Sequence, residues 1–166
     1  VAGREPVLDN KPLEAQLWSL LGDAYNEANE YAPRDDAYEK ALAINPKDPS
    51  VLNNYAYYLS VRGEKLDKAA EMSRKCNEIS PGVATYMDTY AWVLYKQGNY
   101  ADARAEQEKA IAANGGDDGA LLEHYGDILF KLGDTDGAME QWKKAQAAGG
   151  ACDLIDRKVS EGRLVE

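Results

Sequence analysis

The sequence predicts an all-α fold in which pairs of helices repeat along the chain. In "WSLLGDAY", residues 18–25, the large residues recur every three or four positions, as they do along one face of a helix. The same order of large and small residues returns about every 34 residues, which is a period typical of helical repeat arrays. Gly22 lies inside the first of these helices, where glycine lowers stability, so we expect another helix to cross it closely.

The first unit supplies the most complete pattern. Its large and small residues are Trp18, Leu21, Gly22 and Tyr25 in a first helix, followed by Tyr38, Ala41 and Pro46 in a second. They resemble the tetratricopeptide repeat, whose pattern is W-x2-L-G-x2-Y, then A-x3-F, then P. Arg34 stands where this pattern has Ala, so we expect the second helix to be shifted or more loosely packed there.

Three further units follow in phase with the first. Their leading residues are Leu52, Tyr55, Ala56 and Leu59, then Met87, Tyr90, Ala91 and Leu94, then Leu122, Tyr125, Gly126 and Leu129. The tail after the fourth unit is expected to be an amphipathic helix, because a repeat array needs a cap over its last face. The expected boundaries are 1–11 for a linker or the end of a truncated upstream repeat, 12–48, 49–83, 84–117 and 118–150 for four repeats, and 151–166 for the cap.

The resemblance implies a right-handed superhelical α-α solenoid of about four helix pairs with a C-terminal capping helix. The segments "LNNYAYYLS", "DTYAWVLYKQG" and "EHYGDILFKLGD" are also similar to the C-terminal repeats of exported Bacteroidetes-type tetratricopeptide proteins. This narrower resemblance implies a periplasmic or outer-membrane-associated location, which residue composition alone leaves unknown.

Composition excludes several classes of partner. The chain of 166 residues has 29 Asp and Glu against 19 Lys and Arg, a formal net charge of −10. That charge repels nucleic acid and anionic membrane surfaces. No apolar run approaches the roughly 20 residues that a membrane-spanning helix needs, so we expect no membrane insertion.

The resemblance also implies where a partner would bind, because the first helices of such repeats line a concave groove. The residues that it places in that groove and that packing leaves free are Asp23, Asn26, Asn53, Tyr57, Asp88, Trp92, Tyr95, Glu123, Asp127 and Phe130. The aromatics would supply contact area and the carboxylates a preference for a neutral or basic segment. Packing against the next unit is an equal alternative for Tyr57 and Trp92. A clamp for a C-terminal carboxylate is not expected, because no Lys or Arg takes a central groove position.

The sequence holds no pattern that predicts catalysis, a cofactor or a metal site. His124 has neither a nucleophile nor a second metal ligand beside it and is interpreted as a structural histidine. "GDTDGA", residues 133–138, lacks the later ligands of a calcium loop and is interpreted as a turn. Cys76 takes a small packing position and is expected to be buried and inert, and a bond to the distant Cys152 is not expected.

These observations favour a non-enzymatic scaffold that binds an unknown protein or peptide in an acidic, aromatic-lined groove. Two alternatives stay open. One is self-association, with a homodimer formed through an apolar helix face at the N-terminal end of the array. The other is glycan binding, because the same aromatic side chains can stack on sugar rings.

Overall fold

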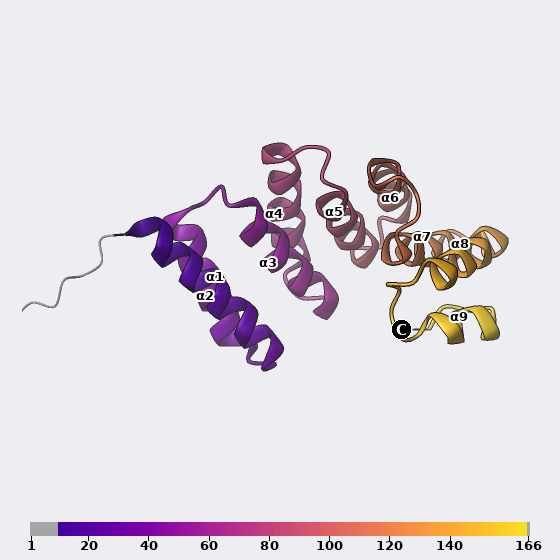
Figure 1. Ribbon diagram of the computed structural model, residues 1–166, viewed down its shortest axis with the longest axis horizontal. Helices are drawn as coiled ribbons and strands as arrows, with labels where there is room; N and C mark the ends of the chain where they lie inside the picture. Colours follow the sequence, from indigo (N-terminus) through magenta and orange to yellow (C-terminus); the bar gives the residue numbers. More distant parts are fainter. Residues whose placement is uncertain (1–9, 166) are drawn as a thin grey trace, which may run out of the picture.

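The computed structural model describes residues 10–165, and within that range the chain is helical without a β-strand. The helices in the described range are α1 (Lys11–Glu27), α2 (Tyr31–Ile44), α3 (Pro49–Arg62), α4 (Leu66–Ile79), α5 (Ala84–Lys96), α6 (Tyr100–Asn114), α7 (Gly119–Lys131), α8 (Thr135–Ala148) and α9 (Ile155–Glu161). The first eight form four pairs that follow one another in an elongated array (Figure 1). The predicted solenoid of helix pairs with a C-terminal helix is confirmed.

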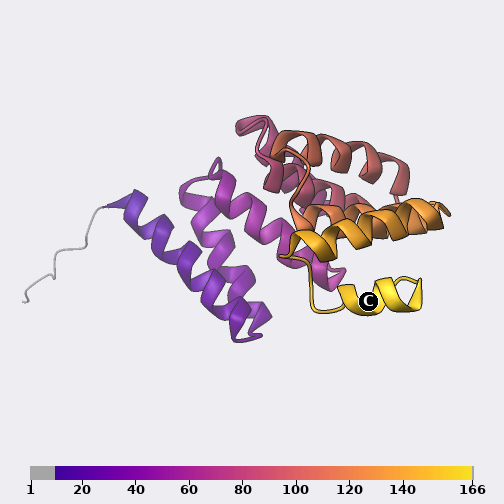
Figure 2. The same ribbon diagram turned by 45° about the vertical axis from the view of Figure 1, so that its right-hand side comes forward.

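The first helix of each pair contacts the first helix of the next pair. These contacts run from α1 to α3, from α3 to α5 and from α5 to α7, so side chains of successive pairs meet along one side of the array. Each pair also touches the next through its second helix, as α4 does with α5 and α6 with α7. The rotated view in Figure 2 shows α9 beside α8 at the C-terminal end of this stack.

Aspartates at helix N-termini fix where several helices begin. The Asp48 carboxylate accepts hydrogen bonds from the backbone N–H groups of Ser50 and Val51, at 3.0 and 3.2 Å. Asp118 caps α7 in the same way. Asp134 accepts from the Gly137 N–H at 2.9 Å, so "GDTDGA" forms the turn that starts α8. Such caps satisfy N–H groups that have no partner inside the helix.

Two glycines allow the helices of a pair to approach closely. A Cβ atom at Gly22 would lie 2.8 Å from the ring of Tyr38, and one at Gly126 would lie 2.4 Å from Cδ1 of Trp142. Both aromatic side chains are fully buried. The close approach predicted at Gly22 is therefore confirmed, and the element that makes it is the second helix of the same pair.

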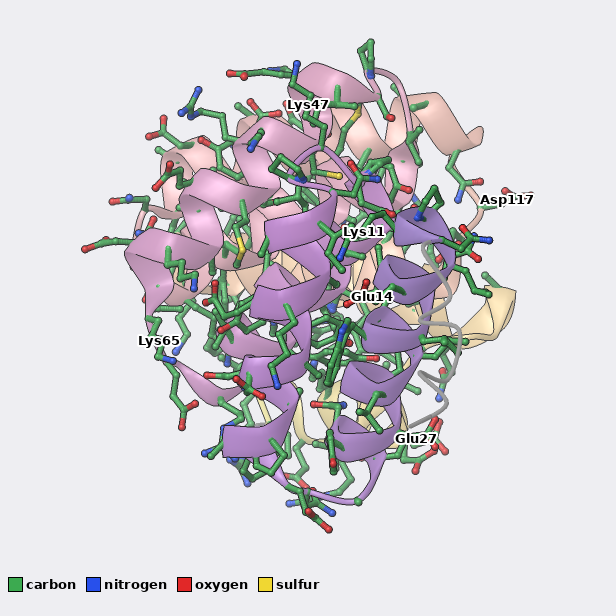
Figure 3. The ribbon with its side chains drawn as sticks, turned by 90° about the vertical axis from the view of Figure 1, so that its left-hand side faces the viewer. Lys11, Glu14, Glu27, Lys47, Lys65 and Asp117 are labelled. Carbon is green, nitrogen blue, oxygen red and sulfur yellow. The ribbon has the colours of Figure 1, made fainter. Side chains whose placement is uncertain are left out.

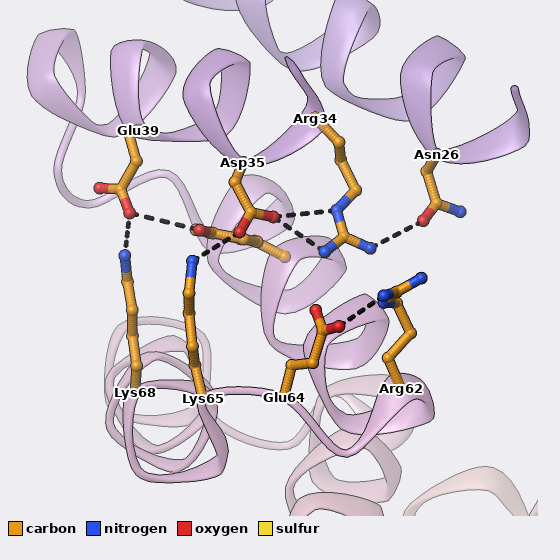
Figure 4. Close-up of polar contacts among 9 residues, drawn as sticks. Asn26, Arg34, Asp35, Glu39, Arg62, Glu64, Lys65 and Lys68 are labelled. Atoms are coloured by element: carbon orange, nitrogen blue, oxygen red, sulfur yellow. Dashed lines mark hydrogen bonds and ion pairs between the residues drawn. The ribbon is translucent and has the colours of Figure 1, made fainter. Parts of the chain in front are cut away.

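Arg34 is the residue whose packing the repeat pattern does not predict. Its side chain is fully buried, and Nη1 donates to Asn26 Oδ1 at 3.1 Å while Nη2 donates to Asp35 Oδ1 at 2.8 Å (Figure 4). Asp35 also binds Lys65 Nζ at 2.6 Å, which links the first pair to the second. Helix α2 accommodates the arginine because every part of its charged head has a partner, so the expected loose packing does not occur.

The outer face of α1 exposes leucines in the part of the chain that the structure describes. The most open are Leu17 and Leu20, at 58% and 63% of their maximal accessibility, with Leu13 and Leu21 beside them. Figure 3 looks onto this end of the array, where Lys11, Glu14 and Glu27 lie along the same helix. None of the described helices is both long and apolar enough to cross a membrane.

The two cysteines have different surroundings, and both thiols are free. Cys76 is buried, and its Sγ donates to the Pro49 carbonyl at 3.1 Å. Burial raises the pKa of the Cys76 thiol to about 11, which keeps it protonated and unreactive, as predicted. Cys152 is exposed and lies in the segment before α9.

Candidate functional site

A hollow of about 280 Å³ opens where α3, α5 and α7 face the C-terminal segment, residues 152–165. We call it the α7 hollow. Its walls are formed by Tyr57 and Val61 of α3, Trp92 and Lys96 of α5, Glu123, His124 and Asp127 of α7, and Cys152, Leu154, Lys158 and Val165 of the C-terminal segment. The apolar wall area comes from aromatic and aliphatic side chains of three successive first helices and of the tail.

A column of stacked rings forms one wall of the α7 hollow. Trp92 lies between Tyr95 and His124, with ring centroids 4.6 Å and 4.3 Å away. Tyr95 is buried in the core of the third pair, so it supports Trp92 and is not itself open to the hollow. Trp92 is half-buried, packs against the core of the third pair and also lines the hollow.

Asp88 forms a hydrogen bond with His124, the ring at one end of this column. His124 Nδ1 lies 2.9 Å from Asp88 Oδ1, and Gln107 Nε2 donates to the same oxygen at 2.7 Å. Burial lowers the pKa of His124, but Asp88 and the further carboxylates Asp127 and Glu123 together outweigh it, so that the net direction is upward. Asp88 is therefore occupied by two partners from within the chain and holds the His124 ring flat against Trp92.

Glu123 and Asp127 are buried, which differs from the open groove position expected for them. Lys158 of α9 donates from Nζ to Glu123 Oε1 at 2.7 Å and to Asp127 Oδ1 and Oδ2 at 2.8 and 2.7 Å. All three residues are only 3% exposed. Burial lowers the pKa of Lys158, but the two carboxylates raise it more strongly, so the ammonium stays charged. The tail thus neutralises the acidic end of the predicted groove.

Each of these carboxylates also has a second partner. Trp142 Nε1 donates to Asp127 Oδ1 at 2.9 Å. Glu123 accepts from the backbone N–H of Cys152 at 2.6 Å and from its Sγ at 2.8 Å. Burial raises the pKa of Glu123, but the hydrogen bonds from Cys152 and Lys158 lower it more strongly. The carboxylates therefore act as attachment points for the C-terminal segment.

Tyr57 of α3 also lines the hollow. It is half-buried and packs against Tyr58 with ring centroids 5.8 Å apart. Burial raises the pKa of Tyr57, with smaller contributions from the nearby carboxylates Asp88 and Glu123. Of the ten residues that the sequence places in a groove, the hollow brings together Tyr57, Trp92, Glu123 and Asp127, with Asp88 directly behind them.

The remaining predicted residues lie elsewhere in the described structure. Asp23 accepts from Tyr38 Oη at 2.5 Å and from Asn54, and Asn26 accepts from Arg34. Asn53 donates to Asn54 on the same helix. Phe130 packs on Trp142 with ring centroids 5.6 Å apart and belongs to the core of the fourth pair. Asp23, Asn26 and Phe130 thus contact other helices of the array, Asn53 contacts only its neighbour in α3, and none of the four lines the hollow.

Sequence reasoning missed the contribution of the tail and of His124 to this site. Within residues 10–165, no group of three or more His, Cys, Asp or Glu side chains is arranged to hold a metal ion. The tail gives no signal of its contribution, because Lys158 is one of several charged residues in the segment "IDRKVSE" and nothing in the sequence distinguishes it. His124 was assigned a structural role, which its bond to Asp88 fits, but its ring also lines the hollow.

Comparison with known proteins identifies the family. Models of the tetratricopeptide repeat match residues 15–48, 37–71 and 91–151. The chain therefore belongs to the tetratricopeptide repeat family, whose members act in general as scaffolds for protein–protein interaction. A search of curated protein sequences gave no match.

Several solved structures share the fold. PilW, described as a widely conserved type IV pilus biogenesis factor, is 18% identical with a TM-score of 0.79, over 93% of this chain and 73% of PilW. The Sgt2 repeat domain from Aspergillus fumigatus is 26% identical with a TM-score of 0.67, over 74% and 82%. A tetratricopeptide repeat protein from Parabacteroides merdae is 19% identical with a TM-score of 0.74, over 94% and 60%.

Proposed function

We propose that this chain is a non-enzymatic scaffold that binds a peptide or protein segment along its first helices, with the α7 hollow as the principal contact. The observation that carries this proposal is the convergence of Tyr57, Trp92 and His124 from three successive pairs on one hollow. Aromatic side chains in such positions supply most of the energy of many protein interfaces. The family resemblance supports the class of function, and the hollow supports its location.

The charge of the site favours a neutral segment over a strongly basic one. Glu123 and Asp127 are bonded to Lys158, and Asp88 is bonded to His124 and Gln107. A basic partner would have to compete with these internal partners for the same oxygen atoms. The preference for a neutral or basic segment expected from the sequence is thereby narrowed, in this proposal, to a neutral one.

The test is capture of partners by the parent chain and by the Tyr57→Ala/Trp92→Ala variant. Removing two aromatic anchors is expected to weaken partner binding at least about tenfold. Tyr125→Ala is the matched control, because Tyr125 donates to Glu108 of α6 and lies outside the hollow. Circular dichroism must show that all three proteins are folded. Equal capture by the parent and the double variant would place the binding site elsewhere.

Self-association is the second candidate, and the exposed leucines of α1 support it. An apolar stripe on an end helix can pair with the same stripe of a second copy. Light scattering over a range of protein concentrations measures this directly, and Leu17→Glu/Leu20→Glu should abolish any dimer. A monomer at all concentrations would exclude this candidate.

A further inference from the structure

The C-terminal segment does more than cover the end of the array, because it binds residues on the face of the first helices. Lys158 reaches Glu123 and Asp127 of α7, and the backbone of Cys152 binds Glu123. Ile155 and Val165 are buried at the two ends of this segment. Three separate polar contacts and two buried apolar side chains therefore hold residues 152–165 in place beside α7.

This attachment gives the α7 hollow its second wall. Leu154 and Val165 line the hollow together with Tyr57, Val61 and Trp92. Without the segment, Glu123 would lose its bonds to Cys152 and Lys158, and Asp127 would keep the bond from Trp142 but lose Lys158. With it, apolar side chains of the segment and of the first helices together line a hollow of about 280 Å³.

The lining has no excess of acidic groups, because its two carboxylates are accompanied by two ammonium groups and by the His124 imidazole. Its carboxylates are Glu123 and Asp127, and its ammonium groups are Lys96 and Lys158. Lys96 Nζ lies 5.0 Å from the centroid of the Trp92 ring, over its face. A charged side chain that entered would lose hydration and would meet acids already held by Lys158. An uncharged apolar side chain would meet Tyr57, Trp92 and Leu154 without that cost.

We propose that residues 152–165 are a specificity-determining wall, which makes the α7 hollow a site for one uncharged apolar or aromatic side chain of the partner segment. At about 280 Å³ the hollow lies just below the range of roughly 300–1,000 Å³ over which pockets enclose whole small-molecule ligands, and we assign it to a single side chain. Leu154 and Val165 set its width, and the Lys158 bridges withdraw the two acids from partner recognition. This inference rests on the function proposed above and specifies the partner chemistry of the same site.

The experiment is selection of a displayed random dodecapeptide library on the intact, immobilised chain. Selected peptides are then scanned with alanine to find the anchor position. Two substitutions change the wall in opposite directions: Leu154→Trp fills the hollow and Leu154→Ala widens it. Leu132→Trp is the matched control, because Leu132 is an exposed leucine at the end of α7 that does not line the hollow. Thermal melts establish that each variant is folded.

We expect the anchor to be Leu, Met, Ile, Phe or Trp. Leu154→Trp should weaken binding of the selected peptides at least about tenfold, whereas Leu132→Trp should leave it unchanged. Leu154→Ala should shift selection towards larger anchors. The two Leu154 variants change the size of the hollow in opposite directions. Weaker binding by Leu154→Trp together with larger anchors for Leu154→Ala therefore indicates a change in the hollow, whereas misfolding would weaken binding without changing the anchor.

Other outcomes separate the failure of this inference from the failure of the proposed function. Anchors of Lys, Arg, Asp or Glu would overturn the inference. Binding that Trp92→Ala removes but Leu154→Trp leaves intact would also overturn it, and the proposed function would stand. If the parent enriches no peptides beyond those enriched by Trp92→Ala, the proposed function fails and the inference fails with it.

Discussion

The His124 imidazole is held between one carboxylate and one indole ring. Its Nδ1 lies 2.9 Å from Asp88, and its ring stacks on Trp92 with centroids 4.3 Å apart. Asp127 and Glu123 of the same helix add further negative potential. The net effect raises the pKa of His124 above its ordinary value, because the nearby carboxylates outweigh the cost of burial.

A residue-scale prediction follows for the pH dependence of stability. Because the folded pKa of His124 is raised, its stabilising contribution is fully present below the unfolded pKa of about 6.5 and is lost as pH rises through the folded pKa. The free energy of unfolding should therefore fall as pH rises above about 6.5. Urea unfolding at several pH values measures it.

His124→Gln is the control for this prediction, because His124 is the only histidine of the chain. The variant should lack the decrease near neutral pH. The same slope in the parent and the variant would show that another group is responsible.

At the scale of the helix pair, the side chain at one position of the first helix is matched in size to the side chain that it faces on the second helix. The four pairs do this in two ways. The first and fourth pairs place Gly22 against Tyr38 and Gly126 against Trp142. The corresponding positions of the second and third pairs hold alanines, Ala56 and Ala91, and in place of the aromatic they hold Ser73 and Gln107, all buried. A large side chain on the second helix thus goes with a missing side chain on the first.

Gly126→Ala tests this matching by the sign of its effect. Helix propensity alone would stabilise the variant by about 1 kcal/mol. The added Cβ would lie 2.4 Å from Trp142, which is itself bonded to Asp127. Overpacking costs up to about 3 kcal/mol, so we expect a net loss of about 2 kcal/mol. Urea unfolding measures the difference, and a more stable variant would contradict the assignment.

At the scale of the whole molecule, the contacts among the described helices join each pair to the next pair along the array. The first pair meets the second partly through surface ion pairs, Lys65 with Asp35 and Lys68 with Glu39 (Figure 4). Exposed ion pairs of this kind contribute little stability. The other end differs, because Lys158 and the C-terminal segment attach α9 to α7 by buried contacts.

Local stability should therefore fall towards the first pair. In a stacked array, a pair that meets its neighbour partly through weak surface ion pairs opens more readily than one held by buried contacts. Native-state hydrogen exchange should give lower opening free energies for amides of α1 and α2 than for those of α5 and α6. Equal protection along the array would show that the chain opens as a single unit.

The sequence by itself determined the helices, their pairing and their repetition. These properties depend on local spacing, as in "WSLLGDAY", on turn residues and on size complementarity within one unit. It also identified Tyr57 and Trp92 as side chains that the repeat pattern leaves unassigned, and the structure places both in the α7 hollow.

Only the tertiary structure determined which polar side chains are already bonded within the chain. Lys158 lies 35 positions after Glu123 and 31 after Asp127, and no local pattern pairs them. Which of Tyr95 and Trp92 faces outward depends on the orientation of α5 about its own axis relative to α6 and α7. The spacing of residues along a helix does not determine that orientation. Two of the predicted groove residues, Glu123 and Asp127, form an internal ion cluster because the tail folds back onto α7, and this burial depends on tertiary packing.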